Sequence, residues 1–466
     1  MKIFSNLIDF KNNIAVITDD NQKITYDELL FLTDNLHSKI NHRCLIFILS
    51  ENSIGSLIGY VSFLRNGIVP LMLDKNINID LLMNLINIYK PDYIYAPKYG
   101  STLESLQYTT YYDNNNYILI QINYETSFPL YDDLALLLTT SGSTGSPKLV
   151  RLSYKNIFSN TQAIISYLDL TNNERPITTL PMYYTYGLSI INTHLTVGAT
   201  ILLTQRTLIE KEFWNFFKSS EATSFGGVPF TYEMLKRLRF FTMNLPSLKT
   251  MTQAGGKLSF DLTKEFVEFS IKKNVKFFVM YGQTEATARM SYLDPKYSFS
   301  KCGSMGKAIP RGKFKLIDEE GNVISTSDTI GELVYKGDNV SLGYAECGED
   351  LIKEDENKGI LVTGDMARRD EDGFYYITGR KKRFIKIFGN RINLDEIEQL
   401  IKTIVIECAC IGNDDKLIIY LISNEKEEQV KKLLFDKLLL HTASVEIKII
   451  DSIQKNESGK VLYNSL

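Results

Sequence analysis

A loop rich in Ser, Thr and Gly follows a short apolar segment in the first third of the chain. Residues 139–148 read TTSGSTGSPK directly after DLALLL. Small residues let backbone amides approach an anion closely, hydroxyl groups add donors and the lysine adds charge, so this composition suits a polyphosphate. The spacing differs from the Walker motif GxxxxGK[ST]. Because surface turns have similar compositions, the loop alone leaves both interpretations open.

Four further segments carry residue types that suit nucleotide chemistry. In chain order they are YGQTE at residues 281–285, TGD at 363–365, GR at 379–380 and NESGK at 456–460. Asp365 accepts hydrogen bonds when ionised and could bind a ribose diol with support from Arg380. Gly255 and Gly256 leave room for a flat adenine, on which Tyr281 could stack.

Together with the loop, these segments resemble in order and spacing the motifs of the ANL superfamily of adenylate-forming enzymes. That superfamily comprises acyl- and aryl-CoA synthetases, nonribosomal adenylation domains and luciferases. The resemblance covers nearly the whole chain, and five motifs in one order are far more specific than any one of them. It implies that ATP and Mg²⁺ are used to activate a carboxylic acid as acyl-AMP with release of pyrophosphate. The acyl group then passes to a phosphopantetheine thiol, preferably that of coenzyme A.

The resemblance also assigns roles to individual residues, and the chemistry explains why such residues are needed. A carboxylate must attack the α-phosphate of ATP, and both are anions, so the site must cancel their repulsion. The expected catalytic residues are Thr284, which donates to the α-phosphate, Glu285, which holds the metal ion, and Lys460, which bridges the carboxylate and the phosphate. The residues expected to bind nucleotide or coenzyme A are Thr139, Thr140, Ser141, Gly142, Ser143, Thr144, Gly145, Lys148, Gly255, Gly256, Tyr281, Gly282, Gln283, Asp365, Arg380 and Gly389.

Two of these assignments have plain structural alternatives. Lys460 lies six residues from the end of the sequence, where a lysine is commonly solvated in a frayed tail. Gly389 falls where the family's glycine lines the tunnel for the pantetheine thiol, but turn glycines are common.

The segment LPMYYTYGLS at residues 180–189 matches the family's acyl-pocket motif. Thr185 stands where members that activate amino acids place an Asp for the substrate ammonium, and a buried ammonium without a carboxylate is costly. An α-amino acid is therefore disfavoured. The expected pocket is apolar and aromatic, which favours a fatty or aryl acid. Its residues are Tyr184, Thr185, Tyr186, Phe225, Gly226, Gly227 and Val228.

Two other functions fit the same motifs. A stand-alone adenylation enzyme could load an acyl or aminoacyl group onto a carrier protein, because carrier proteins and coenzyme A present the same phosphopantetheine arm. A protein that binds an acyl-nucleotide without turnover is a lesser alternative, since a pure binder has little need of Lys460. A metal-dependent hydrolase is excluded because the four histidines lack HxH or HxxxH spacing.

The elements that position these residues are predicted to be α/β. Residues 24–190 alternate helix-like segments with short apolar runs such as 44–49 and 134–138, which is typical of a doubly wound sheet. Residues 195–290 repeat that style. Short alternating strands with turn signals predict a small β-subdomain at about 303–380, and a compact α+β unit follows.

We therefore predict two domains. The large N-terminal domain, residues 1–381, combines doubly wound α/β subdomains with the β-subdomain, and a small mobile α+β domain spans residues 382–466. The resemblance puts the hinge between them at Lys382. The stretch YYDNNNY at 111–117 is expected to be an exposed loop.

Composition limits the partners and the location. The 466 residues carry a formal net charge of -3, which gives no electrostatic reason to expect nucleic acid or an anionic membrane. The five cysteines are scattered, and no apolar run approaches the roughly 20 residues of a membrane span. We expect a cytoplasmic protein that takes a small carboxylic acid, with an acyl carrier protein as a further candidate partner.

Overall fold

The computed structural model describes residues 3–99, 109–122, 128–139, 148–387, 390–413, 416–438, 444–455 and 461–466. The chain divides into two compact units. The first comprises Met1–Lys313 and Lys336–Leu361, and the second comprises Phe314–Tyr335 and Val362–Leu466.

The first unit is built on an eight-stranded sheet in the order β19-β9-β8-β4-β3-β5-β7-β6. Its four central strands pair in parallel, and the strands at both edges pair antiparallel. The central strands are almost wholly buried, as expected where helices cover both faces of a parallel sheet. The strands are β3 (Leu45–Ser50), β4 (Val69–Asp74), β5 (Tyr93–Pro97), β6 (Thr109–Asn114), β7 (Tyr117–Gln121), β8 (Leu134–Thr139), β9 (Leu149–Ser153) and β19 (Gly343–Ala345).

Two smaller sheets complete the strands of this unit. A five-stranded sheet begins with three parallel strands and ends with antiparallel ones; its members in order are β11 (Ser224–Gly227), β12 (Thr250–Gln253), β13 (Lys276–Tyr281), β14 (Ser291–Leu293) and β15 (Lys307–Ala308). A three-stranded sheet contains β10 (Ile201–Leu203), β1 (Ile14–Thr18) and β2 (Lys23–Thr25). The predicted doubly wound style of both regions is confirmed.

Helices cover these sheets. They are α1 (Tyr26–His37), α2 (Ile54–Arg65), α3 (Ile79–Tyr89), α5 (Tyr154–Leu168), α6 (Thr185–Thr196), α7 (Lys211–Ser219), α8 (Pro229–Arg237) and α9 (Phe260–Lys273). Short 3-10 helices are η1 (Leu7–Phe10), η2 (Phe240–Thr242), η3 (Thr284–Ala286), η4 (Pro295–Tyr297), η5 (Gly348–Ile352), η6 (Lys381–Arg383) and η8 (Tyr463–Ser465).

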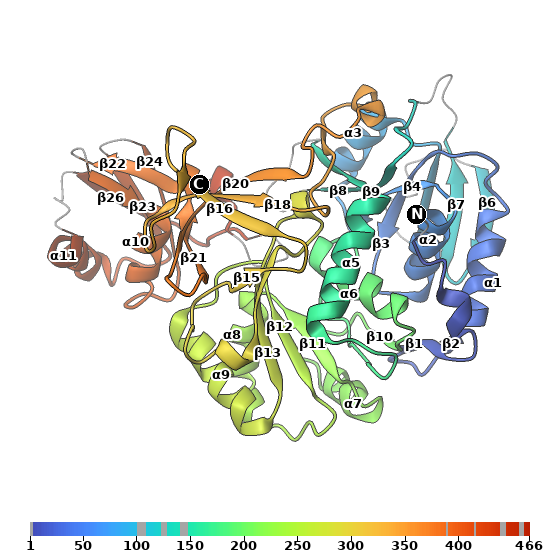
Figure 1. Ribbon diagram of the computed structural model, residues 1–466, viewed down its shortest axis with the longest axis horizontal. Helices are drawn as coiled ribbons and strands as arrows, with labels where there is room; N and C mark the ends of the chain where they lie inside the picture. The colour runs from blue at the N-terminus through green and yellow to red at the C-terminus, as the bar shows by residue number, and fades with distance from the viewer. Residues whose placement is uncertain are drawn as a thin grey trace. The chain divides into compact units, whose positions relative to one another are not determined.

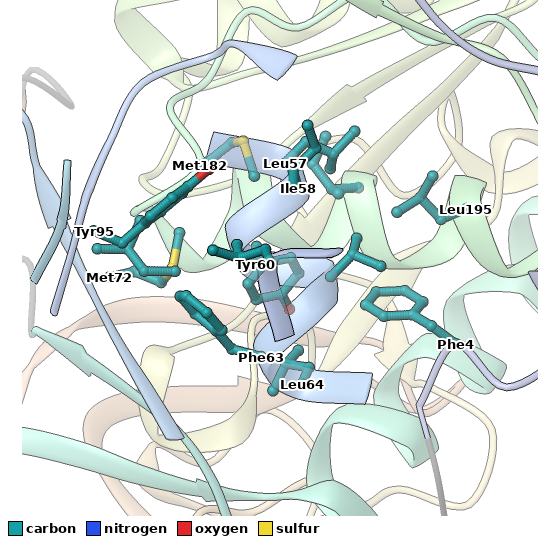
Figure 2. Close-up of a cluster of buried hydrophobic side chains, with 14 of the residues drawn as sticks. Phe4, Leu57, Ile58, Tyr60, Phe63, Leu64, Met72, Tyr95, Met182 and Leu195 are labelled. Atoms are coloured by element: carbon teal, nitrogen blue, oxygen red, sulfur yellow. The ribbon is translucent and has the colours of Figure 1, made fainter. Parts of the chain in front are cut away.

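Helices α5 and α6 lie side by side and pack against both of the larger sheets (Figure 1). Ile190 of α6 packs with Phe278 of β13, while Leu195 of the same helix belongs to the core around β3 and β4. Figure 2 shows Leu195 and Met182 in that core beside Tyr60 of α2. The predicted acyl-pocket motif, residues 180–189, extends into the first turns of α6, so its residues pack in both hydrophobic cores.

The second unit contains a five-stranded sheet followed by a compact α+β region. The sheet consists, in order, of β17 (Val323–Ile324), β16 (Lys313–Ile317), β18 (Gly331–Lys336), β20 (Ile360–Arg369) and β21 (Tyr375–Arg380). The α+β region contains β22 (Phe384–Ile387), β23 (Asn390–Asn393), α10 (Leu394–Ile401), β24 (Cys408–Asn413), β25 (Lys416–Leu421), α11 (Glu427–Leu438) and β26 (Val445–Ile449). Short strands followed by a compact α+β region were predicted from the sequence, whereas strand β23 was not.

The expectation of an exposed loop at residues 111–117 is wrong. Strands β6 and β7 form a hairpin there, and Asn114 pairs with Tyr117. The two turn residues, Asn115 and Asn116, have φ of 50° and 59°, which is the left-handed conformation that two-residue hairpin turns require and that Asn tolerates. Tyr117 is buried and donates a 3.0 Å hydrogen bond to the carbonyl of Leu49. Among the described residues, no helix is long and apolar enough to cross a membrane.

Candidate active site

The Ser/Thr/Gly loop connects two neighbouring strands. Thr139 ends β8 and pairs with Leu149 of β9, and Lys148 directly precedes that strand. The antiparallel register therefore holds both ends of the loop next to each other. The loop residues Thr140, Ser141, Gly142, Ser143, Thr144 and Gly145 lie outside the described residues, as do Gly389 and Lys460, so their roles remain predictions.

Lys148 and Glu285 are linked through Tyr344, a residue that sequence reasoning missed. The Lys148 ammonium lies 3.7 Å from the centroid of the Tyr344 ring, within the range of a cation–π contact, and 3.5 Å from Glu346 Oε1. The Tyr344 hydroxyl donates a 2.8 Å hydrogen bond to Glu285 Oε1. Burial and the Glu285 carboxylate raise the pKa of Tyr344, so its hydroxyl keeps the proton that it donates. The Lys148 ammonium thus contacts the Tyr344 ring, and the Tyr344 hydroxyl in turn contacts the Glu285 carboxylate.

Arg151 holds Tyr344 in place. Its guanidinium is fully buried, donates to the Tyr344 carbonyl at 3.0 Å and forms an ion pair with Glu356 Oε2 at 2.5 Å. These bonds fix β19, whose Tyr344 pairs with Val150 of β9. The sequence signal for this anchor was an arginine inside the apolar strand LVRLS.

The YGQTE motif forms a tight turn at the end of β13. A Cβ on Gly282 would lie 1.6 Å from the Ala288 carbonyl oxygen, so only glycine fits there. Gln283 donates from Nε2 to the Tyr281 hydroxyl at 3.2 Å. Thr284, in η3, is largely buried. The turn therefore fixes the backbone from which Glu285 projects.

The carboxylate of Glu285 fits a magnesium ion. Mg²⁺ prefers oxygen ligands, and carboxylates are its usual protein ligands. Tyr344 orients Oε1 of Glu285, and Oε2 has no hydrogen-bond partner in the part of the chain that the structure describes. A metal ion bound at this carboxylate would supply positive charge to neutralise phosphate oxygens.

Replacing Tyr344 by Phe should weaken the binding of metal–nucleotide while preserving the ring beneath Lys148. Loss of one hydrogen bond to a partly exposed carboxylate should raise the KM for MgATP about threefold to tenfold, with a smaller change in kcat. Steady-state kinetics at varied MgATP would measure this. Tyr344→Leu, which also removes the ring, should raise KM further, and an unchanged KM in both variants would refute the role of Tyr344.

Tyr184 lies against Gly255, which joins the predicted acyl pocket to the predicted adenine site. A Cβ on Gly255, whose φ is 82°, would lie 2.6 Å from the Tyr184 hydroxyl and 2.9 Å from Val228 Cγ1. A side chain there would therefore displace Tyr184. Gly256, the next residue, faces the ring of Pro229.

Tyr186 and Gly226 form the adjoining part of the same wall. The Tyr186 hydroxyl donates to the carbonyl of Thr252 at 2.9 Å, and it would lie 3.0 Å from a Cβ on Gly226. Tyr184, Tyr186 and Val228 all belong to one apolar cluster. The structure thus brings most of the predicted acyl-pocket residues together.

Thr185, Phe225 and Gly227 do not belong to that cluster, and the structure places Phe225 and Gly227 on the other face of β11. The ring of Phe225 packs with Phe217 and Phe240 in a different core, and a Cβ on Gly227 would meet Thr231. Successive residues of a strand point to opposite faces, so neighbours of Gly226 in β11 face away from it. The prediction treated four consecutive residues as one wall and ignored this alternation.

Thr185 is the first residue of α6 and lines a small cavity. That cavity measures about 10 Å³, room for one water molecule, and its polar lining also includes Asn160, Ser189, Asn192 and Thr287. None of these lining residues is a carboxylate, so the cavity offers no counter-ion for an ammonium.

Asp365 and Arg380 are brought together by the register of the second unit's sheet. The two residues are paired between β20 and β21, and Arg380 Nε lies 2.9 Å from Asp365 Oδ1. Asp365 is buried, whereas the Arg380 side chain is 57% exposed. Thr363 Oγ1 accepts a 3.1 Å hydrogen bond from the Asp365 amide. The pair expected to bind ribose is therefore preorganised.

The chain on both sides of residues 456–460 is anchored. Lys455 forms an isolated antiparallel β-bridge with Val461, and the Leu462 amide donates a hydrogen bond to the Gln454 carbonyl at 2.9 Å. Further along, the Tyr463 hydroxyl donates to Glu398 Oε2 at 3.0 Å. The described residues that flank Lys460 are thus packed on the domain rather than frayed.

Comparison with known proteins identifies the family. Residues 7–345 match the family of AMP-binding enzymes, and the chain belongs to that family. It is 29% identical over 345 residues to the 2-succinylbenzoate–CoA ligase of Bacillus licheniformis, covering 72% of this chain and 70% of the relative. It is also 29% identical over 351 residues to the peroxisomal OPC-8:0-CoA ligase 1 of Arabidopsis thaliana, covering 72% of this chain and 64% of that protein.

Solved structures agree on the fold. The o-succinylbenzoate CoA synthetase of Bacillus subtilis in complex with its acyl-adenylate intermediate superposes with a TM-score of 0.81 at 21% identity, covering 100% of this chain and 97% of that one. ATP-bound MatB from Rhodopseudomonas palustris gives 0.77 at 23% identity, with 99% and 97% covered. The predicted superfamily, fold class and enzyme class, an AMP-forming acid–thiol ligase, are confirmed.

Proposed function

We propose that this enzyme uses ATP and Mg²⁺ to convert a carboxylic acid into acyl-AMP and then transfers the acyl group to coenzyme A. The observation that carries the proposal is the pair of contacts that links Lys148 to Tyr344 and Tyr344 to Glu285, next to the end of the Ser/Thr/Gly loop. These contacts place a cation close to a carboxylate that could bind Mg²⁺. The attack of one anion on another requires both kinds of positive charge.

The remaining roles follow from this site and from the relatives. Thr284 would donate to the α-phosphate, Asp365 and Arg380 would bind the ribose, and Lys460 would bridge the two reacting anions. Coenzyme A is proposed as the acceptor because the curated relatives are named coenzyme A ligases. A carrier-protein thiol remains the alternative acceptor. Location in the cytoplasm remains a prediction.

The acid is proposed to lack an α-ammonium group. Thr185 and the polar residues around it include no carboxylate, so an ammonium placed there would be buried without a counter-ion. Tyr184, Tyr186 and Val228 provide the apolar surface for the rest of the acid. Binding of a fatty or aryl chain is consistent with that surface.

A hinge at Lys382 is proposed to separate the two half-reactions. Its neighbours are anchored: Lys381 pairs with Glu332 at 2.7 Å, and Arg383 pairs with Asp395 at 2.5 Å. Lys382 itself is exposed and has no ion pair among the described residues. A backbone rotation there would therefore leave its own side chain undisturbed.

Lys382→Pro should slow thioester formation while adenylate formation persists, because proline fixes φ at the hinge. Single-turnover measurement of each half-reaction would test this, with Lys382→Ala as a control that keeps the backbone free. Equal loss of both half-reactions in the proline variant would refute the hinge.

The proposed function as a whole can be tested by product analysis. Purified enzyme is incubated with ATP, Mg²⁺, coenzyme A and a panel of fatty, aryl, hydroxy and amino acids, and products are identified by mass spectrometry. We expect acid-dependent formation of AMP, pyrophosphate and acyl-CoA in equal amounts. Formation of ADP, or fastest turnover with an α-amino acid, would contradict the proposal. Acyl transfer to a phosphopantetheinylated carrier but not to coenzyme A would select the alternative acceptor.

A further inference from the structure

A histidine, a cysteine and an aspartate meet beside the amino ends of two neighbouring strands. His42 and Cys44 lie just before β3, and Asp92 lies just before β5. Because β3 and β5 pair in parallel, the two segments enter the sheet side by side. One ligand atom from each of the three side chains lies within 4.8 Å of the other two. Within the described ranges, no other group of three His, Cys, Asp or Glu side chains comes as close together.

The backbone that carries these side chains is fixed by hydrogen bonds. The Cys44 carbonyl accepts a 3.0 Å bond from the Val69 amide. The Asp92 amide donates at 3.0 Å to the Leu45 carbonyl. Arg43 donates to three backbone carbonyls at distances between 2.6 and 2.8 Å. The three side chains are therefore brought together by the fold itself, which is what a binding site for an ion requires.

The His42 ring presents one nitrogen to Asp92. Its Nδ1 lies 2.9 Å from Asn41 Oδ1, an atom that can only accept, so in the neutral ring Nδ1 carries the proton. Nε2 then keeps its lone pair and lies 3.4 Å from Asp92 Oδ1, which is another acceptor. Two acceptors at this distance repel each other unless a cation stands between them. A hydrogen bond from the second ring nitrogen is also the usual way in which a metal-binding histidine is oriented.

The Cys44 thiol completes the cluster from the buried side. Cys44 is 3% exposed and packs in the core that contains Ile46 and Tyr93. Burial and the Asp92 carboxylate raise the pKa of Cys44, so the free thiol is protonated. A metal ion that binds Sγ displaces this proton to solvent, and thiolate and carboxylate together balance the two charges of the ion. The ion can enter from solvent, since the His42 side chain is 51% exposed.

We propose that His42, Cys44 and Asp92 bind one Zn²⁺ ion, with a water molecule as the fourth ligand. Thiolate sulfur, imidazole nitrogen and carboxylate oxygen are the ligands of zinc in proteins, in a tetrahedral arrangement. With bonds of about 2.0–2.3 Å, the ligand atoms of such a tetrahedron lie roughly 3 to 4 Å apart, so the three side chains need only small rotations. A thiolate favours a soft cation over Mg²⁺, so this site does not compete for the metal ion of the nucleotide.

The zinc site lies at the opposite end of the sheet from the Ser/Thr/Gly loop. Strand β3 pairs in parallel with β4, and β4 with β8, whose carboxyl end leads into that loop. The amino end of β3 is therefore about 20 Å from the loop, the length of a six-residue strand. The ion joins the segments that begin β3 and β5, so its role is structural, and the inference does not depend on the proposed function.

Cobalt substitution tests the site, because Co²⁺ bound to a thiolate has a charge-transfer absorption that oxygen and nitrogen ligands alone do not produce. The full chain is freed of metal with a chelator, desalted, and titrated with Co²⁺ and then with Zn²⁺. We expect one Co²⁺ per chain with the thiolate absorption and the visible bands of tetrahedral Co²⁺, and Zn²⁺ should displace it. Zn²⁺ should also raise the unfolding temperature, because it binds the folded chain.

Each ligand can be replaced by a residue of similar size. Cys44→Ser, His42→Gln and Asp92→Asn should each weaken Zn²⁺ binding at least about 10²-fold, since loss of a ligand exceeds the effect of losing a group that only orients one. Cys44→Ser should also abolish the thiolate absorption. His42 is exposed, so His42→Gln tests the site even if Cys44→Ser does not fold. Cys347→Ser is the matched control, because it removes a free thiol outside the site, and it should bind Zn²⁺ like the wild type.

The inference is wrong if the wild-type chain binds Co²⁺ without the thiolate absorption or does not bind Zn²⁺ at all. It is also wrong if the absorption survives in Cys44→Ser, or if His42→Gln and Asp92→Asn bind Zn²⁺ as tightly as the wild type. Any of these results would show that His42 and Asp92 form only an exposed ion pair, which contributes little energy, beside a buried thiol.

Discussion

Lys460→Ala should lose adenylate formation and keep thioester formation. The ammonium of Lys460 is expected to neutralise two oxyanions as they approach, an interaction that strengthens toward the transition state and so acts on rate more than on binding. Losing one such preorganised cation should lower the adenylation rate on the order of 10²-fold or more. Conversion of a supplied acyl-adenylate to thioester should continue at a near-normal rate, because that step does not need the lysine.

Lys455→Ala provides the matched control for this prediction. Lys455 lies five residues before Lys460, forms an ion pair with Glu407 and takes part in the β-bridge with Val461. Its removal should leave pyrophosphate exchange almost unchanged. Normal adenylation by Lys460→Ala would show instead that Lys460 is a solvated tail lysine, and the C-terminal part of the resemblance would then carry no function.

Glu285→Gln should be the second most damaging change. The amide keeps an oxygen that can accept the hydrogen bond from Tyr344 but removes the negative charge, and Mg²⁺ requires charged oxygen ligands to displace its water. The rate of exchange should fall on the order of 10²-fold at low Mg²⁺, because a metal ion contributes several kcal/mol of charge stabilisation to such reactions. Partial recovery at high Mg²⁺ would identify the loss as one of metal binding.

Glu346→Gln is the corresponding control. Its carboxylate lies 3.5 Å from the Lys148 ammonium but is 70% exposed, so an exposed ion pair of little energetic weight is removed. Its dependence on Mg²⁺ should match that of the wild-type enzyme. An equal loss in both variants, or a Mg²⁺ dependence unaltered by Glu285→Gln, would contradict the assignment of the metal ligand.

The fold followed from the sequence wherever periodicity was strong. Apolar runs such as those of β3 and β8 became buried central strands, because a parallel sheet covered on both faces needs continuous apolar residues. The hairpin at Asn115 and Asn116 was missed, since polar residues were taken as a sign of exposure rather than of a turn with positive φ. Its flanking aromatic residues were the signal that could have revealed it.

Residues within one motif could be predicted, whereas contacts between distant segments could not. Asp365 and Arg380 are an exception, because the prediction that both bind one ribose required them to lie together, although the strand register that pairs them is visible only in the structure. Tyr344 orients Glu285, and Arg151 holds Tyr344; both lie in segments outside every motif. The buried Arg289 had a weak signal, as a charged residue shortly after YGQTE, but its hydrogen bond to the Tyr167 hydroxyl and the absence of an ion pair within the described ranges are visible only in three dimensions.

The most direct test of the central claim is acid-dependent exchange of labelled pyrophosphate into ATP in the absence of any thiol. Reversible formation of an enzyme-bound acyl-adenylate predicts exchange that requires both Mg²⁺ and a carboxylic acid, that is absent without the acid, and that falls sharply in Lys460→Ala and Glu285→Gln. Label appearing in ATP without an acid, or acyl transfer to coenzyme A that proceeds without any such exchange activity, would contradict the account.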